Sequence, residues 1–72
     1  MARFNDAPKG IRLVRLVRGL RQYDLEAFTG ISAAVIGRIE RGERPASAAE
    51  LAAIAKALCV PVQELSRASD PA

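Results

Sequence analysis

The amino-acid sequence predicts an all-α fold in which five short helices form one small domain. Half of the 72 residues are apolar, but only 4% are aromatic. Alanine and leucine are frequent, a composition that favours packing of helices over a β-sandwich or barrel. Apolar residues recur at helical spacing in five segments that glycine, proline or serine separates. Because so short a chain buries a small core, we expect modest stability.

The first helix is predicted over Ala7–Arg18, after an irregular arm at residues 1–6, and Gly19 is suited to end it. Some of its apolar side chains, together with the next leucine, should cover the helices that follow: Ile11, Val14 and Leu20. Others exceed what one helix face requires: Leu13, Leu16 and Val17. Either this surplus also packs in the core, or it forms a surface for a partner or a second copy.

Two short helices joined by a tight turn are predicted next, over Gln22–Thr29 and Ala33–Arg41. Gly30 suits a left-handed C-cap, and Ser32 is placed to cap the second helix. Apolar residues of that helix recur at helical spacing: Val35, Ile36 and Ile39. Its other residues should therefore face outward: Ala33, Ala34, Gly37 and Arg38. In the helix-turn-helix motif, a helix presented in this way enters the major groove of DNA.

The fourth helix is predicted from the capping-box pattern of Ser47 and Glu50. Apolar residues follow at positions i, i+3, i+4 and i+7: Leu51, Ile54, Ala55 and Leu58. The helix should end near Cys59, which we interpret as a small buried hydrophobe. A fifth helix is predicted over Val62–Arg67, with Val62 and Leu65 facing inward, before a frayed tail at residues 69–72.

The basic charge is concentrated in the part of the chain that holds the paired helices. Residues 1–44 carry nine Lys and Arg against five Asp and Glu, and residues 45–72 carry two against three. The formal charge of +3 is thus the sum of +4 and −1. Such a distribution suits a polyanion, because cations that neutralise phosphates release condensed counterions.

Several classes of protein are disfavoured by the composition. One cysteine allows no internal disulfide, and without histidine no zinc site of the usual ligand types forms. The sequence holds no phosphate-binding glycine loop and no paired acids of a catalytic site. It has no apolar run long enough for a membrane span and no signal peptide. We therefore expect a cytoplasmic protein that is not an enzyme and needs no cofactor.

The chain resembles the Cro/CI-type helix-turn-helix domain, also called the xenobiotic-response-element (XRE) family of bacterial and phage regulators. The resemblance runs from Ile11 to Leu65 and depends on these residues in this order: Arg15, Leu20-x-Gln22, Leu25, Gly30-Ile31-Ser32, Ile36, Arg38-Ile39-Glu40-Arg41-Gly42, Pro45, and Ala57-Leu58-x-Val60-Pro61. It implies a five-helix, lambda-repressor-like domain that binds double-stranded DNA.

The resemblance also implies roles for individual residues. Arg15 should pair with Glu40 as a structural ion pair, and Gln22 should contact a phosphate. Neighbouring residues are our other candidates for phosphate contacts: Arg21, Ser32, Arg41 and Arg44. The family reads bases from these positions: Ala33, Ala34, Val35, Gly37 and Arg38. Of these only Arg38 can form a bidentate pair with guanine, so we expect sparse direct readout, supported by thymine methyl contacts and DNA shape.

Two residues depart from the family pattern. Glu26 stands where alanine is usual, at the close approach of the paired helices, so it should alter their crossing or reach a nearby arginine. Phe28 stands where a polar residue is usual, and it could pack on the N-terminal arm or on a partner.

The function these observations favour is a sequence-specific transcriptional repressor that binds a palindromic operator as a homodimer. Candidates for its dimer interface are Pro45, Val60, Val62, Gln63, Leu65 and Arg67. The last helix could instead serve only to close the core. An alternative function is a protein-interaction module of the antirepressor or antitoxin type, which the alanine-rich third helix and the surplus apolar residues of the first would suit.

Overall fold

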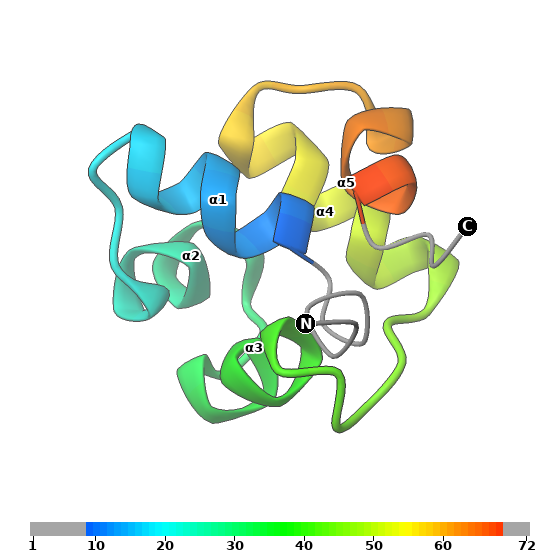
Figure 1. Cartoon of the computed structure of the whole chain (residues 1–72). Helices are drawn as coiled ribbons and strands as arrows, with labels where there is room; N and C mark the ends of the chain where they lie inside the picture. Colours follow the sequence, from blue (N-terminus) through cyan, green and yellow to red (C-terminus); the bar gives the residue numbers. More distant parts are fainter. Residues whose placement is uncertain (1–8, 69–72) are drawn as a thin grey trace.

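The computed structural model describes residues 9–68 of the chain and the side chains of residues 10–65. Five α-helices and no strand occur in this part: α1 (Lys9–Val17), α2 (Gln22–Thr29), α3 (Ala33–Glu40), α4 (Ala48–Leu58) and α5 (Val62–Ala68) (Figure 1). The all-α prediction is confirmed. The predicted arm at residues 1–6, the start of the first helix at Ala7 and the tail at residues 69–72 lie outside the described residues.

The ends of the helices follow local sequence signals. Gly30 adopts a left-handed backbone (φ 81°), and its N–H donates to the carbonyl of Glu26 over 2.8 Å, which closes α2 as predicted. At the start of α4, Ser47 Oγ accepts from the Glu50 N–H, and the Glu50 carboxylate accepts from the Ser47 N–H in return. The predicted capping box is therefore present. α3 ends one residue before the predicted end, because Arg41 is its C-cap and Gly42 takes the positive φ of 77°.

Cys59 corrects the sequence interpretation. It is the C-cap of α4 in a left-handed conformation (φ 61°), and its side chain is exposed rather than buried. A side chain one position beyond the last helical turn has left the face that packs on the core. A Cβ in this conformation costs roughly 1–2 kcal/mol, which glycine would avoid.

All five helices contribute to one core. Its buried members are Ile11, Leu25, Ile36, Ile39, Ile54, Ala55, Leu58 and Leu65. α1 packs chiefly against α5, and α2 packs chiefly against α3. Leu65 is only 1% exposed, so α5 closes the core, and the expectation that this side chain forms part of a dimer surface is wrong. Val62 was predicted to face inward, but it is exposed.

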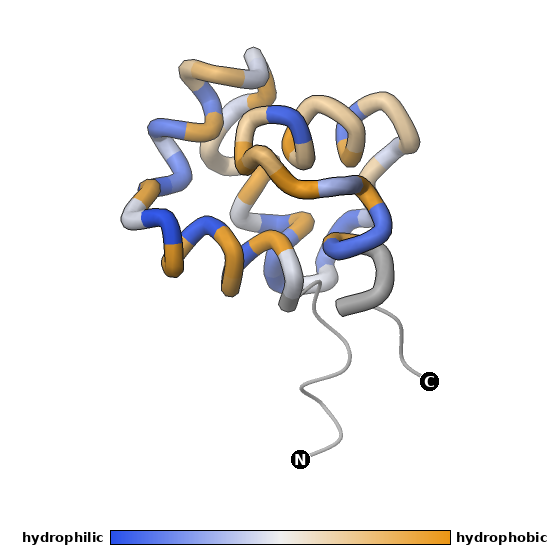
Figure 2. Tube along the Cα trace, turned by 90° about the horizontal axis from the view of Figure 1, so that it is seen from above, coloured by the Kyte–Doolittle hydropathy of each residue, from blue (hydrophilic) through white to orange (hydrophobic). Residues whose placement is uncertain are grey.

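α1 has two unlike faces. Hydrophobic and hydrophilic residues alternate along it (Figure 2), and Ile11, Val14 and Arg15 occupy its inner side. The surplus apolar residues are exposed: Leu13, Leu16 and Val17. The interpretation that they pack in the core is therefore wrong, because Ile11, Val14 and Arg15, which are three and four positions from one another, occupy the inner side. No helix in the described part is long and apolar enough to cross a membrane.

Candidate nucleic-acid interface

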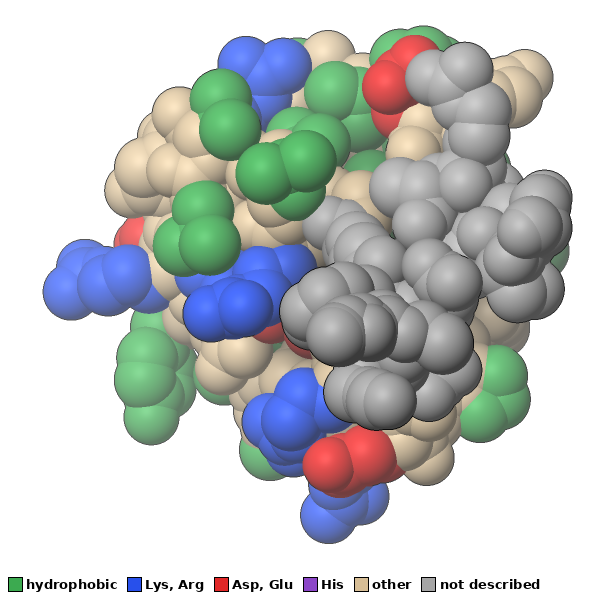
Figure 3. Space-filling view, viewed as in Figure 1, with side chains coloured by type: hydrophobic (Ala, Val, Ile, Leu, Met, Phe, Trp, Pro, Cys, Tyr) green, Lys and Arg blue, Asp and Glu red, His purple; other side chains and the backbone are tan. Residues whose placement is uncertain are grey.

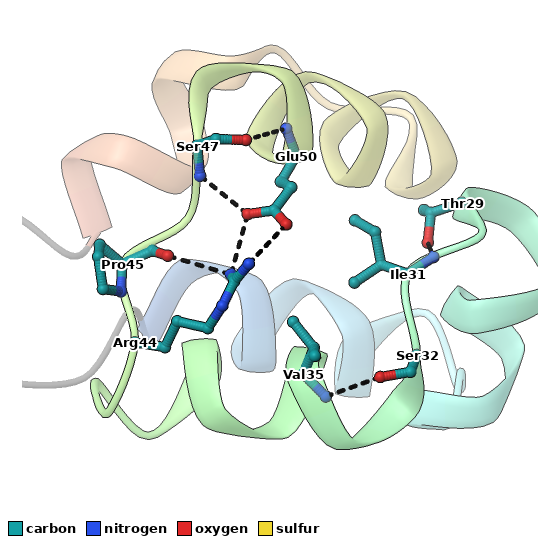
Figure 4. Close-up of polar contacts among 8 residues, drawn as sticks. All are labelled: Thr29, Ile31, Ser32, Val35, Arg44, Pro45, Ser47 and Glu50. Carbon is teal, nitrogen blue, oxygen red and sulfur yellow. Dashed lines mark hydrogen bonds and ion pairs between the residues drawn. The ribbon is translucent and has the colours of Figure 1, made fainter.

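The turn between α2 and α3 is held by side-chain hydrogen bonds. Thr29 Oγ1 donates to the Leu25 carbonyl over 2.7 Å and accepts from the Ile31 N–H over 3.1 Å. Ser32 Oγ accepts from the Val35 N–H over 3.2 Å, which is the predicted cap of α3 (Figure 4). These bonds satisfy backbone groups that a helix end and a tight turn leave unpaired. They fix the direction in which α3 leaves the turn.

Glu26 acts in a way that the sequence did not indicate. Its Oε1 accepts a hydrogen bond from the Ala33 N–H over 2.9 Å, so a carboxylate of α2 caps the first residue of α3. The predicted contact of Glu26 with a nearby arginine is not found among the described residues. A carboxylate at a helix N-terminus is stabilised by the helix dipole and by the free N–H groups there.

The exposed side of α3 is narrower than predicted. Ala34 and Arg38 are exposed and Val35 is half-buried, but Ala33 and Gly37 are buried. The prediction that Ala33 and Gly37 face outward is wrong. They lie four residues apart on the flank that meets α2, Ala33 beside Glu26 and Gly37 beside Gln22. Small residues are required on that flank because the two helices approach closely there.

The predicted ion pair of Arg15 and Glu40 is present and nearly excluded from water. Arg15 Nε donates to Glu40 Oε2 over 2.7 Å and Nη2 donates to Oε1 over 3.0 Å, while their side chains are 9% and 3% exposed. Arg15 Nη1 also donates to the Leu20 carbonyl. This pair ties α1 to the end of α3. The described residues leave no buried side-chain polar atom without a partner.

Gln22 extends that pair toward the surface of the motif. Its Nε2 donates to Glu40 Oε1 over 3.0 Å. Gly37 leaves the space in which this amide lies: a Cβ on Gly37 would stand 3.3 Å from Gln22 Nε2 and 3.1 Å from Arg41 Nη1. Two candidate phosphate-binding side chains, one from each side of the motif, thus converge above Gly37.

All three candidate phosphate-binding arginines already have a carboxylate partner. Arg21 Nε lies 3.5 Å from Asp24 Oδ2, and Arg41 Nε donates to Glu43 Oε2 over 2.9 Å. The Arg21 backbone N–H, more than its guanidinium, lowers the pKa of Asp24. Both arginines are exposed, so these pairs are weak and can be exchanged for phosphate oxygens.

Arg44 is bound more firmly. Its Nη1 and Nη2 donate to Glu50 over 3.0 and 2.9 Å, and Nη1 also donates to the Pro45 carbonyl (Figure 4). The hydrogen bonds that Glu50 accepts from Arg44 and from the Ser47 N–H lower its pKa from the ordinary 4.5 to about 2. The first role of Arg44 is therefore to join the loop after α3 to the start of α4. Sequence reasoning missed this pair because a six-residue separation across a loop has no periodic signal.

Arg38 differs from these arginines. Its side chain is exposed on α3 and makes no hydrogen bond or ion pair within the described residues, although its charge helps, after that of Arg41, to lower the pKa of the Glu43 carboxyl. α3 lies at one edge of the bundle (Figure 1), and Lys and Arg side chains lie at that edge as well as elsewhere on the face seen in Figure 3. The guanidinium of Arg38 is therefore available for a ligand without the loss of an existing hydrogen bond or ion pair.

An open groove lies on another side of the motif. Phe28 is exposed, and with Thr29, Ala53, Lys56 and Ala57 it lines an open groove of about 360 Å³ between α2 and α4. No cluster of potential metal ligands occurs among the residues described.

Comparison with known proteins identifies the class. A family model described as helix-turn-helix matches residues 11–65, so the chain belongs to this family of the XRE type. The protein is a DNA-binding transcriptional regulator. Among solved structures it is similar to the restriction-modification controller protein C.AhdI from Aeromonas hydrophila, with 28% identity and a TM-score of 0.79, over 88% of this chain and 94% of that chain. The search of curated proteins found no match.

Proposed function

We propose that the protein is a sequence-specific repressor that binds a palindromic operator as a homodimer. The observation that carries this proposal is Arg38, an exposed guanidinium on α3 with no partner in the described residues. In the major groove a guanidinium can donate to both O6 and N7 of one guanine. Ala34 beside it would contact a thymine methyl group, and the remaining specificity would come from DNA shape.

Phosphates on either side of α3 would be bound by Arg21, Gln22, Ser32 and Arg41. Gln22 and Arg41 support this assignment because they converge above Gly37. Arg44 would join them only by releasing Glu50. Ala33, Val35 and Gly37 would contribute the shape of the helix rather than side-chain bonds to bases. Each correct bidentate contact discriminates by about 1–3 kcal/mol.

Two copies would engage two half-sites, because one domain of this size contacts little DNA. Half-sites of such dimers lie about 34–36 Å apart, one turn of the double helix. Of the six candidate residues for the dimer interface, Pro45, Val62 and Gln63 are exposed and Val60 is half-buried, whereas Leu65 belongs to the core. The side chain of Arg67 lies outside the described residues. The similarity to a controller protein supports a regulator that acts on a defined operator.

Selection from a random DNA library with the purified protein tests this proposal. We expect a palindromic site with a guanine at the same position of each half-site. Arg38→Ala should remove that preference, whereas Arg12→Ala, which deletes an equal charge from α1, should leave it intact. A selected site without two-fold symmetry would contradict the dimer.

Salt dependence separates this function from the alternative of a protein-interaction module. If phosphates are neutralised, the logarithm of the binding constant falls linearly with the logarithm of salt concentration, by about 0.9 for each phosphate contact on duplex DNA. A flat dependence, together with no selected motif, would favour the interaction module. A reporter gene placed downstream of the selected site would then distinguish repression from activation.

A further inference from the structure

The outer face of α1 carries an apolar stripe that nothing in the described structure covers. Leu13, Leu16 and Val17 are 60%, 53% and 75% exposed. Residues three and four positions apart are neighbours on a helix, so these side chains form one continuous stripe. Figure 3 shows hydrophobic side chains gathered over α1 at the upper left. An exposed patch of this kind on a small domain marks an interaction surface more often than scattered single residues do.

The stripe has a basic border. Arg12 lies beside Leu16 on the helix surface, and Arg18 follows Val17 at the helix end. Neither guanidinium has a hydrogen bond or ion pair in the described part of the chain. By contrast, Arg15, Arg21, Arg41 and Arg44 each pair with a carboxylate. α1 itself contains no acidic residue. The only other arginine left without a partner in residues 10–65 is Arg38, the proposed base reader.

We call this surface the α1 face (Arg12, Leu13, Leu16, Val17 and Arg18), and its apolar stripe points away from the DNA-binding side. Arg15 reaches inward from α1 to Glu40 at the end of α3. Leu13 and Val17 lie two positions from Arg15 in sequence, and such positions do not share a helix face. The apolar stripe therefore remains accessible when α3 occupies the major groove, and Arg12 and Arg18, three positions from Arg15, are exposed beside it.

A second copy of the chain is a poor occupant. If two α1 helices packed antiparallel about the stripe, Arg12 of one copy would approach Arg18 of the other. Since α1 contains no carboxylate to separate these cations, the two copies would repel each other at both edges. Juxtaposed like charges suppress such pairings.

We propose that the α1 face binds an amphipathic helix of a partner protein whose apolar stripe is bordered by Asp and Glu. Leucine and valine side chains would supply apolar contact, and Arg12 and Arg18 would select the acidic border. This surface goes beyond DNA recognition, because it would let the protein hold DNA and a protein partner at the same time.

Two synthetic helical peptides test the proposal with the full-length protein. They share one leucine stripe and differ only in their flanking residues, glutamate in one and lysine in the other. Fluorescence anisotropy should show that the glutamate peptide binds about tenfold more tightly or better, as electrostatic complementarity requires. Backbone amide NMR shifts should change along α1. Equal affinity for both peptides would overturn the proposal.

Variants locate the binding surface. Leu16→Gln should abolish peptide binding while leaving operator binding unchanged, and Arg12→Glu combined with Arg18→Glu should invert the preference between the peptides. Phe28→Ala alters the other exposed apolar site and should have no effect. Loss of binding in Phe28→Ala, but not in Leu16→Gln, would contradict the assignment.

Two other results would show that the α1 face binds something other than an acidic amphipathic helix. Stronger binding to vesicles of phosphatidylglycerol and phosphatidylcholine than to the glutamate peptide would identify a membrane surface. If Leu16→Gln lowered the mass in sedimentation equilibrium from dimer to monomer, the α1 face would be the contact between copies.

Discussion

Glu26 and Ala33 are joined across the motif by a hydrogen bond of 2.9 Å, from the backbone N–H that starts α3 to a carboxylate of α2. The bond has two physical consequences. It satisfies one of the N–H groups that a helix N-terminus leaves unpaired. It also places a negative charge beside the helix that would enter DNA, and this charge would repel the DNA phosphates. Glu26 should therefore stabilise the motif and at the same time lower its affinity for DNA.

Substitution of Glu26 should separate these two effects. Glu26→Ala removes the cap, and we expect a loss of about 1 kcal/mol in the free energy of unfolding. Operator affinity at low salt should rise because a negative charge is lost. Glu26→Gln is the matched control, since it keeps an acceptor oxygen without the charge. It should show the same gain in affinity with a smaller loss of stability. Lower affinity in both variants would contradict this account.

Glu40→Gln should be strongly destabilising. It leaves the Arg15 guanidinium buried without a counter-charge, which typically costs about 3–5 kcal/mol. For a domain of this size each kcal/mol lowers the melting temperature by about 4–8 °C. Calorimetry should therefore find a large decrease, or no folded state. The double variant Arg15→Met and Glu40→Leu should recover most of the stability, because well-packed apolar residues can replace a buried pair. An unchanged melting temperature in Glu40→Gln would show that the pair is not structural.

Gly37→Ala should affect stability and DNA binding in opposite directions. Alanine in a helix interior is favoured over glycine by about 1 kcal/mol. The new Cβ would press on Gln22 and Arg41, whose flexible ends can move by a few tenths of an ångström. We expect an equal or higher melting temperature and a several-fold weaker affinity for the operator.

The effect of Gly37→Ala on affinity can be assigned by repeating the substitution in Gln22→Ala. If Gly37 acts through the placement of Gln22, the loss of affinity should be much smaller in that background. An undiminished loss would mean that the new methyl group meets the DNA itself.

Glu50 should make stability depend on acid pH. Its folded-state pKa is about 2, below its ordinary value of 4.5. A lowered carboxyl pKa stabilises the folded state above the unfolded-state pKa, and this contribution is lost as the pH falls through the folded-state value. Urea titrations should thus find the largest difference between the wild type and Glu50→Gln above pH 4.5, a small one near pH 2, where the folded-state carboxyl is half protonated, and almost none below it. A difference that stayed constant across this range would contradict the assigned cause.

Local signals account for the part of the fold that the sequence predicted. The caps at Gly30, Ser32 and Ser47 depend on residues within one helical turn. The positions of α2 and α4 were predicted from such local signals. The core was predictable where apolar residues recur at helical spacing. For the surplus apolar residues of α1 the sequence left two alternatives open, core or partner surface, because the outer side chains have the same hydrophobicity as the inner ones. Only the packing of α5 and α3 decides which side is covered.

The candidate site was predictable to a smaller extent. The Arg15–Glu40 pair followed from family resemblance, but three other contacts depend on distances across loops or between helices: Glu26 with Ala33, Gln22 with Glu40, and Arg44 with Glu50. The burial of Ala33 and Gly37 similarly reflects how closely α2 approaches α3. Periodicity along one helix contains no information on such an approach.

The narrow exposed side of α3 also limits how this protein can change its target during evolution. Of its eight residues only Ala34 and Arg38 are exposed, while five are buried. Most substitutions in α3 would therefore change the stability of the fold before they could change the recognition of DNA. New operators would be reached mainly through these two positions and through mutations in the DNA site itself, so that regulator and operator would diverge together in small steps.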